Sequence, residues 1–215
     1  MSLSAYDVIF YLKELTGEKI LILERTGLKV TEALERLERF VSKCKKCPLS
    51  KTRTNVVFGS GNPLTGFLIV GEAPGQEEDK RGLPFVGRAG KKLDEIMRRA
   101  GIRREGVYIT NTIKCRPPMN RDPEENELKS CFPYLEKQIE ILKPRVIVAL
   151  GRYASYVLTG KKISVKRERG IVYEYGNSKV VITIHPSRVL KNPEEEENLY
   201  NDLVLAKKVY LSGHP

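Results

Sequence analysis

Four short apolar runs, separated by segments with helical spacing, constrain the fold of this chain more than any other feature. The runs are FLIV (67–70), VYIT (107–110), VIVAL (146–150) and VVITI (180–184). Helical patterns occupy 87–101, 122–144 and 152–160, and a last one places Leu199, Leu203, Ala206 and Tyr210 on one face. Repeated strand-helix units favour an α/β fold of three layers, with a central, mainly parallel sheet of about four strands.

Local signals add detail to this expectation. The segment 171–184 has turn residues at Gly176 and Asn177, which predicts a hairpin. Pro133 lies inside the helical pattern at 122–144 and is expected to split or kink that helix. Helical spacing at 5–15 and 31–44, the second capped by Thr31, predicts a helical N-terminal extension over residues 1–40. With a core over 41–215, the 215 residues are expected to form a single domain.

The charge balance narrows the class of partner. The chain carries 38 basic and 27 acidic side chains, a formal net charge of +11, which favours nucleic acid first and an anionic membrane surface second. No stretch reaches the roughly 20 apolar residues that span a bilayer, and the N-terminus lacks a signal-peptide pattern, so we expect a cytoplasmic protein without a membrane segment. Many Lys, Glu and Arg with few Gln are also typical of thermophiles.

Polar residues follow the apolar runs directly. The first run continues into the turn GEAPG (71–75) with Glu72, the second ends at Asn111, and the fourth leads into His185, Pro186 and Ser187. In a parallel sheet, ligands bind outside the carboxyl ends of the strands. A carboxylate, a carboxamide and an imidazole are therefore expected to meet at one edge.

Four cysteines form a further pattern: Cys44, Cys47, Cys115 and Cys131. Without a secretion signal a disulfide framework is the weaker interpretation, and metal or cluster binding is favoured. Four thiolates suit zinc or a [4Fe-4S] cluster, and the spacing alone favours zinc slightly.

Several segments together resemble the family 4 uracil-DNA glycosylases, the iron-sulfur type found in thermophilic bacteria and archaea. They are CKKCPL, RTNVVFGSGNP, GEAPGQEEDKRGLPFVGRAG, YITNTIKCRPP and HPS, in this order. The resemblance extends from about Cys44 to the last helix. It implies a monofunctional repair enzyme that flips uracil out of single- or double-stranded DNA and hydrolyses the N-glycosidic bond. Free uracil and an abasic site are the products of this step in base excision repair.

The resemblance also implies roles for single residues. Glu72 acts on the water or the sugar, and His185 donates to uracil O2. Asn111 reads the uracil edge and Phe85 stacks on the base, while Glu78 or the Gly75 backbone excludes thymine. The substrate-binding set is completed by Gly71 and by Ala73, where the wider superfamily often has aspartate. Residues 41–215 become the catalytic core.

DNA contacts and the cofactor follow from the same resemblance. Ser187 and Arg188 are expected at phosphates, and Arg188, Val189 or Leu190 as the wedge that fills the gap left by the flipped base. The four cysteines hold a [4Fe-4S] cluster in a structural role. We expect a monomer. Contact with a sliding clamp lacks a clear motif, because AYDVIFYL (5–12) is a poor match.

Two alternatives from other classes remain at this point. A non-catalytic zinc module that binds nucleic acid accounts for the charge and the cysteines but leaves Glu72, Asn111 and His185 unexplained. A flavodoxin-like nucleotide-binding enzyme fits the alternating pattern, but the first turn lacks a dinucleotide-type glycine fingerprint.

Overall fold

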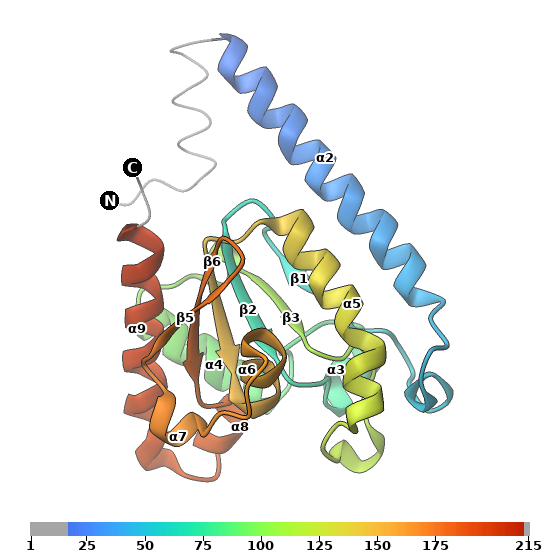
Figure 1. Ribbon diagram of the computed structural model, residues 1–215, viewed down its shortest axis with the longest axis vertical. Coiled ribbons are helices and arrows are strands. Elements are labelled where there is room, and N and C mark those ends of the chain that lie inside the picture. The colour runs from blue at the N-terminus through green and yellow to red at the C-terminus, as the bar shows by residue number, and fades with distance from the viewer. Residues whose placement is uncertain (1–16, 213–215) are drawn as a thin grey trace.

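A six-stranded sheet forms the centre of the molecule in the computed structural model, which describes residues 17–212, with side chains from residue 27 on (Figure 1). The strand order is β1-β3-β2-β4-β6-β5. The bounds are β1 Ser60–Gly61, β2 Phe67–Gly71, β3 Tyr108–Asn111, β4 Val146–Leu150, β5 Val172–Tyr175 and β6 Ser178–Thr183. The predicted α/β fold is confirmed. The four expected strands are the parallel ones, β3, β2, β4 and β6. Of the two antiparallel edge strands, β5 belongs to the predicted hairpin, and β1 was not expected.

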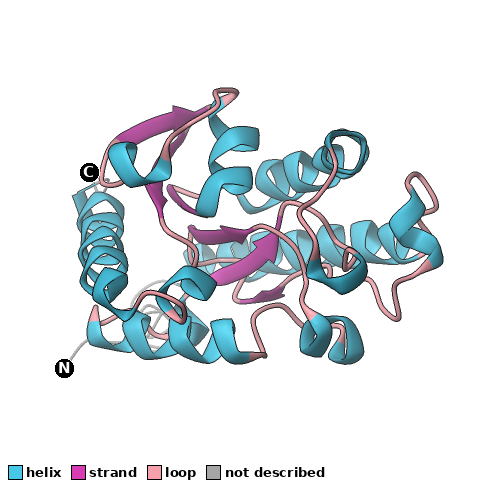
Figure 2. Cartoon of the chain, turned by 90° about the horizontal axis from the view of Figure 1, so that it is seen from below, coloured by secondary structure: helices cyan, strands magenta, loops and turns pink. Residues whose placement is uncertain are grey.

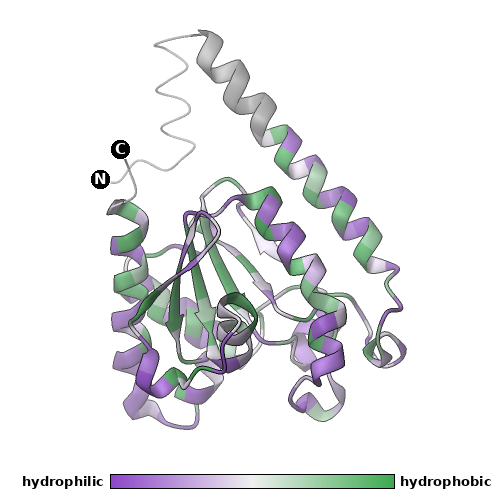
Figure 3. Cartoon of the chain, viewed as in Figure 1, coloured by the Kyte–Doolittle hydropathy of each residue, from purple (hydrophilic) through white to green (hydrophobic). Residues whose placement is uncertain are grey.

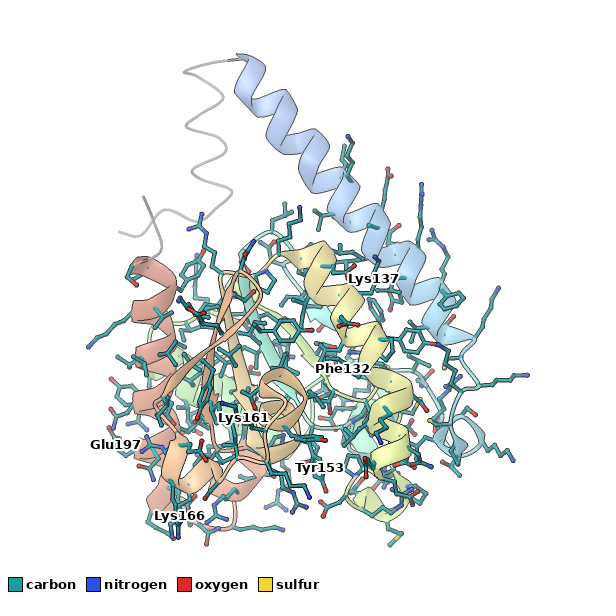
Figure 4. The ribbon with its side chains drawn as sticks, in the orientation of Figure 1. Phe132, Lys137, Tyr153, Lys161, Lys166 and Glu197 are labelled. Atoms are coloured by element: carbon teal, nitrogen blue, oxygen red, sulfur yellow. The ribbon has the colours of Figure 1, made fainter. Side chains whose placement is uncertain are left out.

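Alternation along the strands divides the core between two faces. In β2, Leu68 and Val70 belong to the cluster that includes residues of α2 (Gly17–Ser42), α5 (Glu125–Leu142) and α6 (Gly151–Thr159). Phe67 and Ile69 belong to the other cluster, with α4 (Arg88–Arg99) and α9 (Glu196–Ser212). The central strands β2 and β4 are buried along their whole length and hydrophobic (Figure 3), and charged side chains such as Lys166 and Glu197 point outward (Figure 4). The short helices are α3 Gln76–Arg81, α7 Val165–Glu168, α8 Pro186–Val189, η1 Pro48–Lys51, η2 Arg104–Gly106, η3 Pro118–Asn120 and η4 Pro193–Glu195.

The helix α2 differs from the sequence expectation at its start. The predicted cap Thr31 lies inside this 26-residue helix, and its hydroxyl donates to the carbonyl of Gly27 (3.0 Å) instead of capping a helix end. Leu34 and Val41 are buried, so the second half of α2 packs on the body of the protein, while Figure 1 shows its first half rising beyond the sheet. The helix expected at 5–15 lies outside the described residues.

Two other local predictions have different outcomes. The hairpin of β5 and β6 turns at Gly176, where φ is +55°, and is confirmed. Pro133 does not split its helix, since α5 continues through it. Pro133 and Lys129, four residues earlier, are both exposed, so the carbonyl that loses its hydrogen-bond donor lies on the solvent face.

The carboxyl ends of the parallel strands meet at one edge, at the bottom of Figure 1 and facing the viewer in Figure 2. The turns into α3 and α8 and the loop between β3 and α5 lie there. Among the described residues, no helix combines the length and apolar character that crossing a bilayer requires.

Candidate active site

A cavity of about 430 Å³ opens at the carboxyl edge of the sheet. Its walls come from the turn after β2, the start of α4, the loop after β3 and the segment around α8. The predicted site residues that line it are Glu72, Ala73, Gly75, Glu78, Phe85, Asn111, His185, Ser187 and Leu190. Gly71, Arg188 and Val189 do not. The structure therefore brings together most of the residues that the sequence pointed to.

Gly71 makes room for the floor of the cavity. It is the last residue of β2 and pairs in register with Asn111, the last residue of β3. A methyl group on Gly71 would lie 2.4 Å from Asn111 Oδ1 and 2.5 Å from Phe85 Cζ. Because any larger residue would displace one of these groups, glycine allows the amide and the ring to approach each other.

Asn111 presents a buried acceptor to the cavity. Asn111 is 1% exposed. Among the buried side-chain nitrogen and oxygen atoms in the described part of the chain, its Oδ1 is the one that lacks a hydrogen-bond partner. A buried polar atom without a partner is costly, so this arrangement favours a ligand that donates a hydrogen bond. Behind it, the ammonium of Lys114 donates to the Asn111 carbonyl (2.7 Å) and to Gln138 Oε1 (2.6 Å), which fixes the backbone at the strand end.

Phe85 forms a wall of the cavity with an unusual backbone. It has φ of +53° and is 5% exposed. The Glu78 carboxylate accepts from the next two amides, those of Val86 (2.9 Å) and Gly87 (2.7 Å), and so holds the turn that follows the ring. The Phe85 ring lies 5.7 Å from the His185 ring, centroid to centroid. Glu78 thus positions the aromatic wall as well as lining the cavity.

Glu72 supplies the carboxylate. Its carbonyl accepts from the Thr112 hydroxyl (2.5 Å) and the Ile113 amide (3.2 Å), which ties the turn after β2 to the loop after β3. Burial raises the pKa of Glu72 to about 7, with a further rise from Asp122 and an opposing effect of Arg152. Asp122 and Arg152 form an ion pair with each other. Glu72 is therefore poised to change its charge near neutral pH.

His185 follows β6 and supplies a neutral imidazole. The Ser187 amide donates to Nδ1 (3.2 Å), and the Ser187 hydroxyl lies 2.8 Å from the same nitrogen. This bond assigns the ring proton to Nε2. Burial lowers the pKa of His185 to about 4, although one side of the ring opens on the cavity. His185 is thus a neutral hydrogen-bond donor at ordinary pH.

The comparisons with known proteins agree with this geometry. The sequence model of the Uracil DNA glycosylase superfamily matches residues 58–205. The chain belongs to this superfamily. It is 52% identical to a type-4 uracil-DNA glycosylase of Thermotoga maritima over 77% of this chain and 87% of the relative. Type-4 uracil-DNA glycosylases of Archaeoglobus fulgidus and Sulfurisphaera tokodaii are 45% and 41% identical, over 80% and 83% of this chain and 90% and 88% of theirs. The family resemblance found in the sequence is confirmed.

Basic side chains around the cavity of this superfamily member were missed by sequence reasoning. Arg88 lines the cavity at the first residue of α4, Arg121 from the loop after β3, and Lys191 beyond α8. The glycines around Arg88, in GRAG (87–90), could have indicated a helix start beside a ligand. Arg121 carried no such signal, because its place depends on the fold of an irregular loop.

The segment around α8, where the superfamily resemblance placed the wedge, exposes little apolar surface. Val189 is 2% exposed and packs in the core. Arg188 forms a two-point ion pair with Glu195 (2.5 and 2.6 Å). Leu190 lines the cavity. The buried Val189 is therefore not placed to insert into DNA, which leaves Arg188 and Leu190 of the three candidates.

The four cysteines lie around one small cavity between α2 and α5. Each of three sulfur atoms accepts a hydrogen bond: Cys115 from Arg53 (3.2 Å), Cys131 from the Lys114 amide (3.3 Å) and Cys44 from the Tyr134 hydroxyl (3.2 Å). As the side chains stand, the described residues contain no group of three or more His, Cys, Asp or Glu that could hold a metal ion. The donor set, four thiols with hydrogen-bond donors directed at them, fits an iron-sulfur cluster in chemistry.

Proposed function

We propose that the chain excises uracil from DNA by flipping the nucleotide into the cavity and hydrolysing its N-glycosidic bond. The observation that carries this proposal is the unpartnered Oδ1 of Asn111, buried beside Phe85 in the cavity. Superfamily membership and the type-4 relatives support it. The products are free uracil and an abasic site, so the reaction begins base excision repair.

Recognition of the base rests on Asn111 and Phe85. Oδ1 of Asn111 accepts from uracil N3-H, and its amide group donates to O4, an order that cytosine reverses. The Phe85 ring supports the face of the extruded base, which must leave the helical stack before its bond can be reached. Close packing at Gly71 keeps the amide and the ring together, so the pocket is formed before the base arrives.

The chemistry is divided between Glu72 and His185. As the C1′–N1 bond breaks, its electron pair passes to uracil, and Nε2-H of His185 donates a hydrogen bond to O2, where negative charge develops. Glu72 in its ionised form faces the cationic sugar and orients a water molecule. The water oxygen bonds to C1′, and its proton passes to the Glu72 carboxylate. A neutral His185 suits its role, because it donates without carrying a buried charge.

The four cysteines are proposed to hold a [4Fe-4S] cluster. When bound, the cluster supplies cross-links among protein segments, since hydrolysis needs no redox step. Cys44 and Cys47 follow α2, Cys115 lies in the loop after β3, and Cys131 lies in α5. The cluster would thereby fix the loop after Asn111, the residue proposed to recognise uracil, to α2 and α5.

DNA is held by charge around the cavity in this proposal. Arg88, Lys191 and Ser187 are the proposed phosphate contacts, and the net charge of +11 adds general attraction to a polyanion. We propose that the enzyme acts as a monomer, since the proposed catalytic and base-reading residues meet within one chain. We also propose that it works in the cytoplasm.

The direct test uses an oligonucleotide with one uracil. Purified protein should produce alkali-labile abasic sites at that position and none in the matched thymine oligonucleotide. Glu72→Gln and His185→Ala should each slow single-turnover excision by roughly 10²-fold or more with little loss of DNA affinity. Binding to DNA without any base release would instead favour a non-catalytic nucleic-acid-binding module.

A further inference from the structure

The loop between β3 and α5, residues 112–124, carries an exposed apolar side chain at its tip. Met119 is 91% exposed, whereas the next most exposed large apolar side chain in the described part of the chain, Phe40, is 64% exposed and contacts Tyr134. This loop lies at the carboxyl edge of the sheet, below the start of α5 in Figure 1. A methionine side chain is therefore exposed to solvent at the edge of the sheet that contains the cavity, called here the uracil pocket.

The backbone of this tip is strained. Met119 has φ of +53° and ψ of +20°, and Asn120 has φ of +54°. The left-handed region is uncommon for residues other than glycine, and asparagine tolerates it better than methionine does. Such conformations persist only where the surroundings impose them, and they gather at ligand-binding sites.

Contacts on both sides hold the tip in place. Arg116 Nε donates to Asn120 Oδ1 (2.7 Å). The Arg121 guanidinium forms a two-point ion pair (2.7 and 2.9 Å) with Glu127, whose side chain is fully buried. The loop is thus pre-formed, and little ordering would be needed when it meets a partner.

The position of the tip identifies the partner. Pro117, Asn120 and Arg121 line the uracil pocket, but Met119 does not, so its side chain lies outside the pocket on the rim. DNA strands that continue beyond a flipped nucleotide must cross this rim. Leu83, two residues before Phe85, is a second exposed apolar side chain beside a pocket wall, at 46%. Across the pocket, Val189 is buried and Arg188 is ion-paired with Glu195. Leu190 is half-buried and lines the pocket itself.

We propose that Met119 is a DNA wedge: its side chain inserts beside the flipped uridine and stacks against the neighbouring base. The inference rests on the proposed uracil excision. Methionine is among the apolar residues that unstack base steps, and its unbranched, polarizable side chain adapts to the face of any base. Inserted there, it fills the space left by the uracil and slows the return of that base to the stack.

The test compares duplex and single-stranded substrates of one sequence. In Met119→Ala, single-turnover excision from a U:A duplex should fall about tenfold, equivalent to about 1.4 kcal/mol of barrier. Excision from the single strand should stay within about twofold of wild type, since no base pair has to open. 2-Aminopurine placed next to the uracil should show less unstacking with the variant. Met119→Leu should retain the wild-type behaviour.

Two controls show whether Met119 acts on the DNA rather than on the fold of the protein. Leu211→Ala removes another exposed apolar side chain, 55% exposed at the far end of α9, and should change neither rate. Thermal melting of Met119→Ala should match wild type. The wedge is refuted if Met119→Ala excises uracil from the duplex at the wild-type rate or loses equal activity on both substrates. It is also refuted if wild type excises uracil from single strands alone. Failure of wild type on both substrates overturns the proposed function, and this inference with it.

Discussion

The position of Glu72 in the fold determines the pH at which its carboxyl group ionises. Burial at the strand end, reinforced by Asp122, raises its pKa to about 7, whereas Arg152 opposes the rise. Tyr153, on the first turn of α6, is another neighbour, because Glu72 also affects its pKa, and Figure 4 shows it at the same lower edge. The carboxyl group is therefore protonated below about pH 7 and ionised above it.

This pKa predicts the pH dependence of excision. Since the proposed chemistry needs the ionised carboxylate, the single-turnover rate should rise about tenfold per pH unit below pH 7 and level off above it. His185, with a pKa of about 4, is neutral across pH 5 to 9 and adds no step in that range. Glu72→Gln should be slow and lack the rise around pH 7. A wild-type rate independent of pH from 5 to 9 would contradict the role of Glu72.

The strand ends are the elements that the sequence located best. The apolar runs predict where β2, β3 and β6 end, so the sequence alone assigns Glu72, Asn111 and His185 to one edge. Gly71 shows what the pattern could not provide. Glycine is needed at this position because Asn111 and Phe85 approach it closely in space. These two residues lie 40 and 14 positions after Gly71 in the chain, so a local pattern does not reveal the contact.

Gly71→Ala tests that close approach. The added methyl group must displace the Asn111 amide or the Phe85 ring, because it would lie within about 2.5 Å of both. We expect the variant to fold, to bind DNA through the unchanged phosphate contacts, and to lose most uracil excision, roughly 10²-fold. Circular dichroism, DNA affinity and single-turnover rates should be measured together. Normal excision by Gly71→Ala would show that the pocket does not have this shape.

Loops and helix boundaries were predicted less well, for physical reasons. Thr31 has the chemistry of a cap, yet α2 continues on both sides of it, and the second half of this helix packs on α5. Pro133 was expected to interrupt a helix that tertiary contacts keep continuous. The positions of Met119 and Arg121 depend on the left-handed backbone conformation of Met119 and Asn120. The sequence gives no signal for this conformation at residues other than glycine. Local propensity is overridden wherever distant segments meet.

At the scale of the whole molecule, the cysteines join segments that are far apart in sequence. Anaerobically purified protein should be brown and contain about four irons per chain. Cys115→Ser should lose this absorbance and lower both thermal stability and DNA affinity, because metal binding and folding are coupled. Ser130→Ala, which alters the same cavity without removing a thiol, should keep the colour. Stoichiometric zinc without visible absorbance would refute the cluster.

The central claim is that the cavity at the sheet edge reads uracil through Asn111. Single-turnover excision by wild type and Asn111→Asp, on oligonucleotides that differ only in uracil or cytosine at one position, tests it most directly. The aspartate keeps the size of the side chain but offers no donor to O4, and sites that lose a buried hydrogen-bond partner discriminate by up to roughly 10⁴ to 10⁵-fold. Asn111→Asp should lose most uracil excision and gain, at best, slow cytosine excision. A folded Asn111→Asp variant that releases uracil at the wild-type rate would contradict this role of Asn111.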